Sequence, residues 1–540
     1  MAVFHDLQAL DFVHQHPLVT IGSVLCLWTL VLVTYRVFFH PLSKFPGPRL
    51  AAATYWYETY HDVWHKGDYT SQIGRLHEKY GPIIRINPDE LHVNDPYFID
   101  TLYPGPGKKR DIPTWWLQGT NLQGSHFGTE AHDLHRERRG ALNRFFSRAT
   151  VVKLEPLVKK NAIKLCQNLE TNAGSESPLD AANILACFGT EVIMQYMFDR
   201  SYGYLDDPKF KKSMYKAIHR ATEFMILFRH FRICETIVLN TPDFIMEWLD
   251  PDVQIWRSMR LDTRKQIRTI KKQQAAESLN DTKKENDGIH TIFHEILQSN
   301  LPPAEKTTER LGREAQAITG AGLETLSWSL SVDLYHILST PRILQKLRAE
   351  LLAAMPDMPP LSAITPADLP SWTTLEQLPY LNACIHEGLR LSYGLATRIS
   401  RSAPTETLTY TYTPPGATAP KTFFIPPGTP VSMTSVHIHH DPRIFPDSDS
   451  YIPERWLGPD GKRERPGLER YLLSFSKGTR QCLGINLAYA ELFIGLASLI
   501  RFLGDRLELF ETTKEDVRFY RDDFVPGVKP GSKGVRVLVK

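Results

Sequence analysis

A charge-free apolar segment near the N-terminus restricts what this chain can fold into. Residues Pro17 to Tyr35 carry no charged side chain and are mostly Leu, Val, Ile and Trp. A helix needs about 20 apolar residues to cross a bilayer. We therefore expect residues 17–39 to form a transmembrane anchor, preceded by a short lumenal N-terminus at residues 1–16.

A cleaved secretory signal is the alternative for this segment. Such a signal has a positive N-terminal region and a small-residue cleavage site close behind the apolar stretch. The residues before the span contain no Lys or Arg, and the first Ala-x-Ala match, at residues 51–53, lies too far downstream. Arg36, Lys44 and Arg49 follow the span, which favours a cytoplasmic location for the rest of the chain. A permanent single-pass anchor is the better interpretation.

The remaining chain is long enough for one large domain with a sizeable core. The whole chain has 540 residues, of which 42% are hydrophobic. Pro46-Gly47-Pro48 stiffens and turns the chain, so we expect a hinge at residues 40–50 and a single domain at residues 51–540. The net charge of +3 is too small to argue for nucleic acid, although it allows a basic patch for an acidic protein partner.

Cysteine usage indicates a reducing compartment. The chain is neither short nor cysteine-rich, and no Cys-x-x-Cys pair suggests a zinc site. The six cysteines are far apart in sequence: Cys26, Cys166, Cys187, Cys234, Cys384 and Cys482.

The hydrophobic periodicity predicts a mainly α-helical fold with small β-sheets. Helical spacing extends over residues 132–249, and further helices are expected at 313–338, 342–352, 381–391 and 486–503. Residues 83–88 and 408–436 have strand patterns. Residues 270–287 are polar and charge-rich, which indicates a solvated loop or a helix end. The sequence contains no internal repeats.

The richest motif surrounds Cys482, in the stretch Phe-Ser-Lys-Gly-Thr-Arg-Gln-Cys-Leu-Gly at residues 475–484. A thiolate is a strong electron donor and a soft iron ligand, and it needs nearby donors to keep its charge. Gly478 and Gly484 allow backbone N–H groups to approach the sulfur. Arg480 supplies a cation for a carboxylate at the same site. The helix expected after Gly484 directs its positive end toward the thiolate.

An inert buried cysteine is the usual alternative for a lone cysteine. Here the pattern Phe-x-x-Gly-x-Arg-x-Cys-x-Gly fixes five identities, and a chance match in the chain is on the order of one in several thousand. The pattern resembles the haem signature of the cytochrome P450 monooxygenases. The resemblance implies that Cys482 is the ligand of the haem iron, and that Phe475 and Arg480 belong to the haem site.

Glu387 and Arg390 lie three residues apart on an expected helix, in an apolar context. A buried pair of this kind needs further hydrogen-bonding partners, and the segment Pro-Glu-Arg-Trp at residues 453–456 supplies Arg455. The family resemblance implies that Glu387, Arg390 and Arg455 form a triad that holds the fold near the cysteine loop.

Residues 321–325, Ala-Gly-Leu-Glu-Thr, lie inside the long apolar helix. Glycines there cost about 1 kcal/mol each relative to Ala, and a local break in the helix would open a groove. The alternative is that Thr325 only bonds the carbonyl of Ala321. The family resemblance gives Glu324 and Thr325 the role of delivering protons to bound oxygen. Leu326 occupies a position where many members have a second hydroxyl, which weakens one proton path.

The basic segment at residues 135–139 has a solvated helix face as its alternative. The family has Trp-x-x-x-Arg here, with both residues contacting a haem propionate. His135 and Arg139 occupy those positions, and a histidine can still donate to a carboxylate. Arg398 matches a family arginine that meets a propionate.

The resemblance covers nearly the whole chain and implies the cytochrome P450 fold with haem b, iron protoporphyrin IX. It implies a monooxygenase that hydroxylates or epoxidises an apolar small molecule. Terpenoid or polyketide intermediates of fungal secondary metabolism are the expected substrates. No Gly-rich nucleotide motif follows a strand near the N-terminus, so electrons come from a separate NADPH-dependent reductase, with cytochrome b5 as a second candidate donor. The expected location is the endoplasmic reticulum membrane, with the catalytic domain cytoplasmic.

Two other functions remain open from the sequence. A haem-thiolate isomerase or dehydratase would rearrange an oxygenated substrate without a reductase, and Glu324 and Thr325 argue against it. A non-enzymatic membrane protein would bind lipid in a pocket, and the cysteine signature argues against that. The aromatic residues of such a pocket are Trp115, Trp116, Phe224 and Phe228. We also expect residues 224–227 and 244–249 to form an apolar lip that dips into the membrane.

Overall fold

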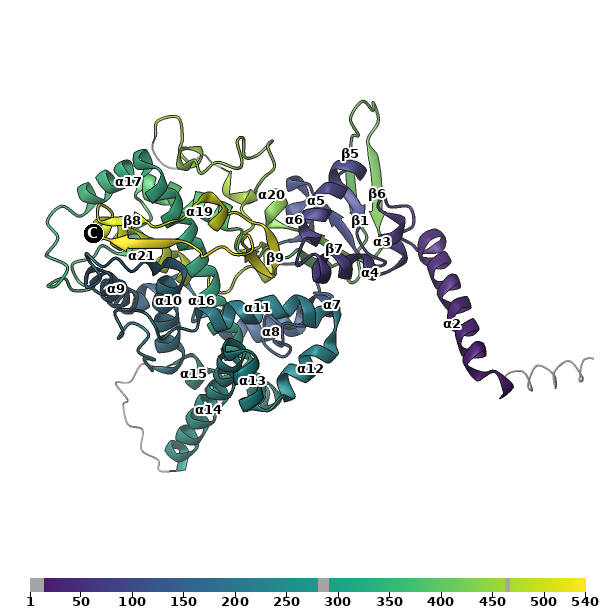
Figure 1. Cartoon of the computed structure of the whole chain (residues 1–540), viewed down its shortest axis with the longest axis horizontal. Coiled ribbons are helices and arrows are strands. Elements are labelled where there is room, and N and C mark those ends of the chain that lie inside the picture. Colours follow the sequence, from purple (N-terminus) through teal and green to yellow (C-terminus); the bar gives the residue numbers. More distant parts are fainter. Residues whose placement is uncertain (1–13, 280–290, 462–466) are drawn as a thin grey trace, which may run out of the picture.

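The computed structural model describes residues 14–279, 291–461 and 467–540. It shows one helical body from which a single N-terminal helix projects (Figure 1). Most of the expected lumenal N-terminus, and the end of the polar stretch at residues 280–287, lie outside the described residues.

The projecting segment consists of α2 (Pro17–Thr34) and the π-helical turn η1 (Tyr35–Phe39). It is 23 residues long, has a mean hydropathy of 2.1 and buries none of its side chains in the body. Pro17 at the first helical position suits a helix start, because its missing N–H would have no partner there. A second apolar helix, α21 (Ile485–Leu503), is two-thirds buried and belongs to the core. The structure is therefore consistent with one N-terminal membrane anchor.

The expected hinge is held against the first sheet. Gly47 has a φ of +152°, and a Cβ there would lie 2.4 Å from the carbonyl oxygen of Arg85. The N–H of Arg85 donates to the carbonyl of Pro46 at 2.7 Å, and its guanidinium donates to the carbonyl of Arg36 at 2.8 Å. Only glycine allows this close approach, so the end of the anchor is fixed to the body.

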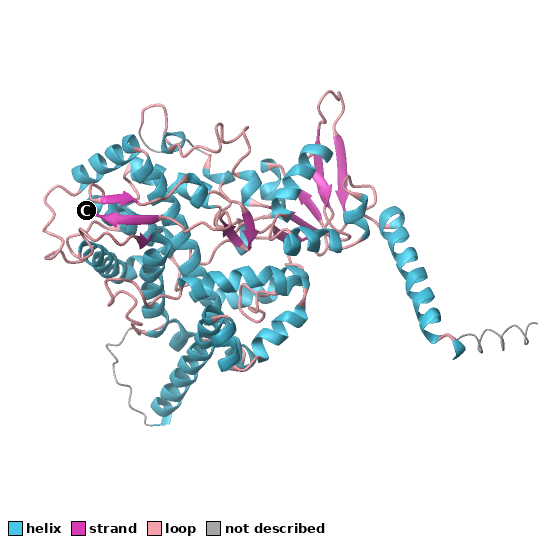
Figure 2. Cartoon of the chain, viewed as in Figure 1, coloured by secondary structure: helices cyan, strands magenta, loops and turns pink. Residues whose placement is uncertain are grey.

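The sheets are small, as the sequence predicts (Figure 2). The largest has the order β1 (Ile83–Arg85), β2 (Leu91–Val93), β7 (Pro430–Met433) and β4 (Ile399–Ser402), and only its β2–β7 pair is parallel. The hairpin of β5 (Leu408–Tyr412) and β6 (Lys421–Ile425) projects near the anchor. The other sheets pair β3 (Leu179–Asp180) and β8 (Leu507–Leu509) with β11 (Arg536–Val539), and β9 (Arg521–Asp523) with β10 (Val525–Gly527).

Four helices and one central helix form the core. The central helix is α16 (Thr308–Ser339), which confirms the helix predicted at residues 313–338. The Thr307 side chain caps it by accepting a hydrogen bond from the N–H of Arg310. Around it pack α10 (Ala181–Phe198), α19 (Pro379–Ser392) and α21, and α9 (Arg148–Glu170) packs against α10 and α21.

The remaining helices of at least seven residues cover this core. They are α5 (Tyr69–Tyr80), α8 (His132–Asn143), α11 (Tyr215–His230), α12 (Arg232–Asn240), α13 (Asp243–Leu249), α14 (Pro251–Leu279), α15 (Ile292–Gln298) and α17 (Pro341–Ala354). The shorter helical segments include α3 (Arg49–Ala53), α4 (Trp56–Thr59), η2 (Tyr60–Trp64), α6 (Ile99–Leu102), α7 (Thr114–Leu117), α18 (Trp372–Leu375) and α20 (Ser435–Ile438). The polar stretch from residue 270 continues α14 as helix up to Leu279, because Lys, Gln and Ala favour helix even on a solvated face.

A glycine sets the close contact between α16 and α19. A Cβ on Gly388 would lie 1.9 Å from Oδ1 of the buried Asp333 of α16. The same Asp333 oxygen accepts a hydrogen bond from the hydroxyl of Tyr451 at 2.9 Å. Gly388 lies between Glu387 and Arg390, so this contact fixes α19 at the point where it carries those two charged residues.

Candidate active site

The segment 475–484 forms a tight loop before α21. The N–H of Cys482 donates to the carbonyl of Phe475 at 2.8 Å, which closes the loop. Gly478 has a φ of +73°, and a Cβ there would lie 2.3 Å from the carbonyl oxygen of Pro104. This position therefore requires glycine. The Phe475 ring packs against Tyr489 of α21, with centroids 5.2 Å apart.

Cys482 is exposed in the structure, although many protein atoms lie near its sulfur. Its environment of protein atoms raises the pKa of the thiol by desolvation, while the N–H of Gly484 and the charge of Arg139 act to lower this pKa. Arg139 of α8 donates to the carbonyl of Gln481 at 2.5 Å and so lies beside the cysteine. The loop thus provides the donor and the cation that a thiolate needs.

Arg480 is fixed by backbone carbonyls rather than by a carboxylate. Its guanidinium donates to the carbonyls of Thr129 and Glu130 at 2.6 Å each, and to that of Arg110 at 3.3 Å. The side chain is buried. None of these three contacts supplies the carboxylate that the sequence predicts as the partner of Arg480.

Three arginines and the neutral ring of a histidine form a group that we call the cation cluster: Arg139, Arg401, Arg480 and His135. Burial, then the charges of Arg401 and Arg139, lower the pKa of Arg480 to about 9. Burial lowers the pKa of Arg401 to about 10, and burial with the neighbouring arginines lowers that of His135 to about 2. Among the described residues, no carboxylate forms an ion pair with any member of the cluster. Buried cations in such a group require an external anion.

Arg398 has a different environment, which corrects the expectation that it meets a cofactor carboxylate. Its guanidinium is buried between two carboxylates of this chain, with Nη2 2.5 Å from Glu58 and Nε 3.2 Å from Glu90. It also lies over the ring of Trp115 at 4.7 Å. The residue that joins the cation cluster is Arg401, three positions later in β4, which the sequence analysis missed.

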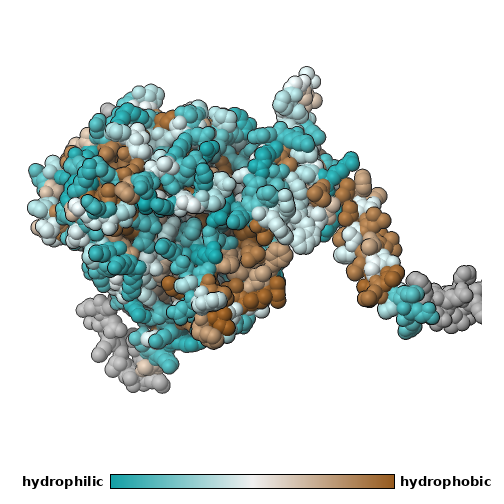
Figure 3. Space-filling model, in the orientation of Figure 1, coloured by the Kyte–Doolittle hydropathy of each residue, from teal (hydrophilic) through white to brown (hydrophobic). Residues whose placement is uncertain are grey.

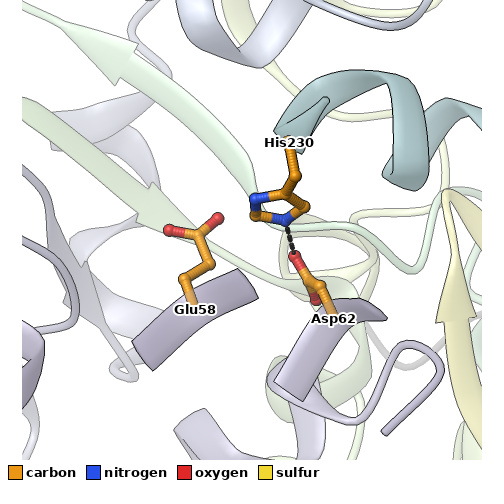
Figure 4. A group of neighbouring side chains, drawn as sticks. All are labelled: Glu58, Asp62 and His230. Atoms are coloured by element: carbon orange, nitrogen blue, oxygen red, sulfur yellow. Dashed lines mark hydrogen bonds and ion pairs between the residues drawn. The ribbon is translucent and has the colours of Figure 1, made fainter. Parts of the chain in front are cut away.

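Glu58 also belongs to a group with possible metal-ligand geometry, together with Asp62 and His230 (Figure 4). His230 Nε2 lies 2.9 Å from Asp62, and its Nδ1 lies 3.1 Å from the Thr59 hydroxyl. Glu58 bonds both Arg398 and, at 2.9 Å, the Asn87 amide. These contacts satisfy the group as a buried ion-pair network, so it carries no argument for a metal ion.

The structure places Glu387, Arg390 and Arg455 in contact. The Arg390 guanidinium meets the Glu387 carboxylate at 2.8 and 3.0 Å, and Arg455 Nε meets it at 2.9 Å. The N–H of Ile452 and the Trp456 indole also donate to this carboxylate, at 2.9 and 2.8 Å. Burial alone would raise the pKa of Glu387, but the two arginines and these hydrogen bonds hold it below its ordinary value.

His439 connects this network to the cysteine loop. Its Nδ1 lies 2.7 Å from the carbonyl of Arg390, and its Nε2 accepts from the N–H of Leu473 at 2.8 Å. Burial lowers its pKa to about 3, so the ring is neutral, as one donor and one acceptor require. The sequence gives little signal for this role, because His439 is one of three histidines in the segment His-Ile-His-His at residues 437–440 and nothing there distinguishes it.

The middle of α16 opens at the motif singled out in the sequence. Between Glu314 and Ile337, every residue is buried except Gly320, Ala321, Gly322 and Thr325. The Thr325 hydroxyl donates to the carbonyl of Ala321 at 2.8 Å, as the alternative interpretation anticipated. The expected break in the helix is not seen, because residues 308–339 form one continuous α-helix. The small side chains alone create the open face.

Leu326 faces away from this open stretch. It is buried against Gly189 of α10, where a Cβ would lie 2.8 Å from its Cδ2. A hydroxyl at this position would enter the α10–α16 interface. Leu326 therefore removes no donor from the Thr325 side of the helix.

Comparisons with known proteins agree with this geometry. The sequence model of the family described as Cytochrome P450 matches residues 49–514. The chain belongs to the cytochrome P450 family. It is similar to cytochrome P450 monooxygenase tpcC of Cochliobolus heterostrophus, with 41% identity over 519 residues, or 94% of each chain. It is also 41% identical to cytochrome P450 monooxygenase MO6277 of Ascocoryne sarcoides over 539 residues, covering 98% of this chain and 100% of the relative. Stellatic acid synthase of Emericella variicolor is 36% identical over 547 residues, covering 97% and 94%.

Membership of the cytochrome P450 family makes the chain an oxidoreductase with a haem-thiolate cofactor, and excludes the non-enzymatic lipid carrier. The residues present fit that cofactor. Haem carries two propionate carboxylates, and the cation cluster offers buried basic groups without a carboxylate of their own. An open thiol beside Arg139 and the Gly484 N–H suits an iron ligand.

Separate substitutions of Arg401 and Arg398 test whether Arg401, and not Arg398, holds the cofactor. Hydrogen bonds to charged groups contribute about 1.5–3 kcal/mol, so we expect Arg401→Gln to release haem roughly tenfold faster or more. Arg398→Gln leaves two buried carboxylates unpaired, a change that costs about 3–5 kcal/mol, and should mainly lower the Tm. Haem transfer to apomyoglobin and thermal unfolding measure the two effects. Faster haem release in Arg398→Gln than in Arg401→Gln would contradict the assignment.

Proposed function

We propose that this P450 is a monooxygenase that binds haem b through Cys482 and hydroxylates or epoxidises an apolar small molecule. The observation that carries the proposal is the open stretch of α16 at residues 320–325, which exposes the Thr325 face of an otherwise buried helix. Substrate and oxygen need such a face, and small side chains leave room for them. When bound, the haem supplies the oxygen-activating chemistry.

The chain's own residues hold the cofactor and supply protons. Cys482 binds the iron, and the N–H of Gly484 and Arg139 stabilise its charge. His135, Arg139, Arg401 and Arg480 take the two propionates. Phe475 closes the loop that carries Cys482 and would belong to the haem site. Thr325 holds a water or a proton on the open face, and Glu324 gives it a proton.

An intermediate of secondary metabolism, of the terpenoid or polyketide class, is the proposed substrate. One relative is named stellatic acid synthase, which says that this relative forms an organic acid. Other relatives of similar length come from fungi and are named cytochrome P450 monooxygenases. An apolar substrate agrees with a membrane-anchored enzyme, because such molecules partition into lipid.

A separate NADPH-dependent reductase on the same membrane is the proposed electron donor, with cytochrome b5 as a second candidate. A hollow of about 490 Å³ lies on the outer side of the cysteine loop, and its lining includes Arg139, Lys477, Gly478 and Gln481. Its basic residues suit an acidic partner, and it borders the residue next to Cys482. This face would bring the donor near the thiolate.

Thr325→Ala tests the oxygenase chemistry. The variant should fold, bind haem and accept electrons, because its hydroxyl contacts only the Ala321 carbonyl among the described residues. Glu324 still supplies protons in this variant, but without the Thr325 hydroxyl they are not held in place for product formation, and general acid assistance is worth about 10²- to 10⁴-fold. With reductase, NADPH and a panel of terpenoids, we expect NADPH consumption to persist, product to fall and peroxide to rise. Thr325→Ser is the matched control and should stay close to the wild type. Wild-type coupling in both Thr325→Ala and Glu324→Gln would favour the isomerase alternative.

An apolar band beside the anchor supports a second membrane contact. Figure 3 shows hydrophobic residues gathered over the α12–α13 region. Large exposed side chains there are Ile233, Ile237, Phe244, Trp248 and Leu249. Exposed Trp56 and Trp64 extend the band, and both pack on Phe231 at 6.2–6.5 Å. The expected lip at residues 224–227 is wrong, because those residues lie in α11 and are buried or half-buried. We propose that the band rests on the endoplasmic reticulum membrane from the cytoplasmic side.

Removing residues 1–40 should leave part of the protein membrane-bound. Adding Ile237→Ser, Phe244→Ser and Trp248→Ser to that truncation should release it, since each fully buried large apolar side chain contributes about 1.5–3 kcal/mol. Flotation with microsomes measures the bound fraction. Val152→Ser, which changes an exposed apolar residue of α9 at the end of the body away from the anchor (Figure 1), is the control and should change nothing. Equal release by the truncation alone would contradict the proposed membrane contact of the band. Protection of the domain from protease added to sealed microsomes would contradict its proposed cytoplasmic location.

A further inference from the structure

Glu324 is held by a side chain from another helix. Nδ1 of His219, on α11, lies 2.8 Å from Oε1 of Glu324 on α16. The Glu324 side chain is 6% exposed and that of His219 is 31% exposed. The two helices pack against each other, so the contact joins the helix with the open face to a more accessible one.

The carboxylate is bonded on one side only. Oε2 of Glu324 is buried and has no hydrogen-bond partner among the described residues. An unpaired buried carboxylate oxygen is costly, and such atoms are found where a group has a task besides stability. The His219 ring is itself oriented by stacking on Tyr215, with centroids 5.8 Å apart and planes at 25°.

On its other side, His219 lies within the electrostatic range of two acids, Glu223 and Asp523, that line a hollow open to solvent. Glu223 lies one turn further along α11, and Asp523 belongs to β9, which packs on α11. The hollow measures about 300 Å³, and its other charged lining residues are Asp62, Lys66, Arg220 and Arg521. Arg521 lies 2.7 Å from each of the two carboxylates. His219 therefore stands between this hollow and the buried Glu324.

We propose that His219 is the positioning residue of Glu324, which fixes Oε1, leaves Oε2 free for proton transfer toward Thr325, and returns protons from the Glu223–Asp523 hollow. The inference rests on the proposed proton role of Glu324. Each turnover of the pair moves one proton. The imidazolium gives a proton to the carboxylate that has just lost one, and the neutral imidazole regains a proton from solvent in the hollow. Only N–H and O–H bonds form and break.

The charges around His219 keep it protonated at neutral pH. Burial lowers its pKa, but the charge and hydrogen bond of Glu324, with the charges of Glu223 and Asp523, outweigh this effect and raise the pKa to about 9. The other ionisable groups nearby are Tyr215, Lys216 and Arg220 on α11, Arg521 on β9, and Asp180 at the start of α10. The stability that this raised pKa gives to the fold is fully present below the ordinary value of 6.5 and is lost as the pH rises through about 9.

Substitutions of His219 separate a proton route from a simple tether between helices. His219→Gln keeps a hydrogen-bond donor without a titrating group, and His219→Arg keeps the cation without releasing its proton. With haem-loaded protein, reductase, NADPH and O₂, we expect both variants to oxidise NADPH about 10-fold more slowly at pH 7.5, less than the roughly 10²- to 10⁴-fold of a lost general acid. The wild-type rate should fall as the pH passes 9, and the rate of His219→Gln should not.

Thermal unfolding gives a readout independent of turnover. Because the His219 pKa is raised, the wild type should exceed His219→Gln in Tm at pH 6.5, and this difference should shrink by pH 10. His219→Arg should keep a Tm near the wild type. The matched control is His230→Gln, which removes a histidine–carboxylate pair at the other end of α11 and should leave the NADPH rate unchanged.

Two failures can be told apart. If Glu324→Gln oxidises NADPH at the wild-type rate, the proposed role of Glu324 is wrong. If Glu324→Gln is slow while His219→Gln and His219→Arg both match the wild type, only the inference about His219 is overturned.

Discussion

The buried carboxylate of Glu387 is the interaction on which the cysteine loop depends. It binds Arg390 of its own helix and draws in Arg455 and the backbone of residue 452. From Arg390 the chain of contacts passes through the neutral ring of His439 to the N–H of Leu473, just before the loop. Breaking a buried ion pair leaves an uncompensated charge, which costs about 3–5 kcal/mol. The position of Cys482 therefore depends on a charge network with no contact to substrate.

The arginines near the site divide into two kinds, and the division gives the site its function. Arg398 is neutralised within the protein by Glu58 and Glu90. It therefore connects α4 and the residue before β2 to the residue before β4. Arg139, Arg401 and Arg480 have no such partners among the described residues, and burial makes them costly without an anion. A cofactor with two carboxylates meets this requirement, so its binding energy would offset the cost of assembling the cluster.

Local patterns in the sequence predict the main features of the fold and part of the site. The motif around Cys482, the long helix at residues 313–338 and the spacing of Glu387 and Arg390 are readable because each lies within one continuous segment. The sequence does not show which of Arg398 and Arg401 is left without a carboxylate partner. That depends on Glu58 and Glu90, which lie more than 300 residues from Arg398 in sequence. The partner of Glu324 is equally hidden, since His219 lies on a helix whose own pattern shows only an amphipathic surface. The family resemblance connects Leu326 with a proton path, because many members have a hydroxyl at this position, whereas in the structure its side chain packs on Gly189.

The central claim is that Cys482, and no other cysteine, binds the haem iron as a thiolate. The most direct measurement is the absorption spectrum of the reduced protein under carbon monoxide, compared between wild type, Cys482→Ser and Cys234→Ser. Cys234 is half-buried on α12, far along the chain from the loop, and serves as the control. We expect the red-shifted Soret band of a thiolate-ligated haem in the wild type and in Cys234→Ser, and its loss in Cys482→Ser. Persistence of that band in Cys482→Ser would show that Cys482 is not the iron ligand.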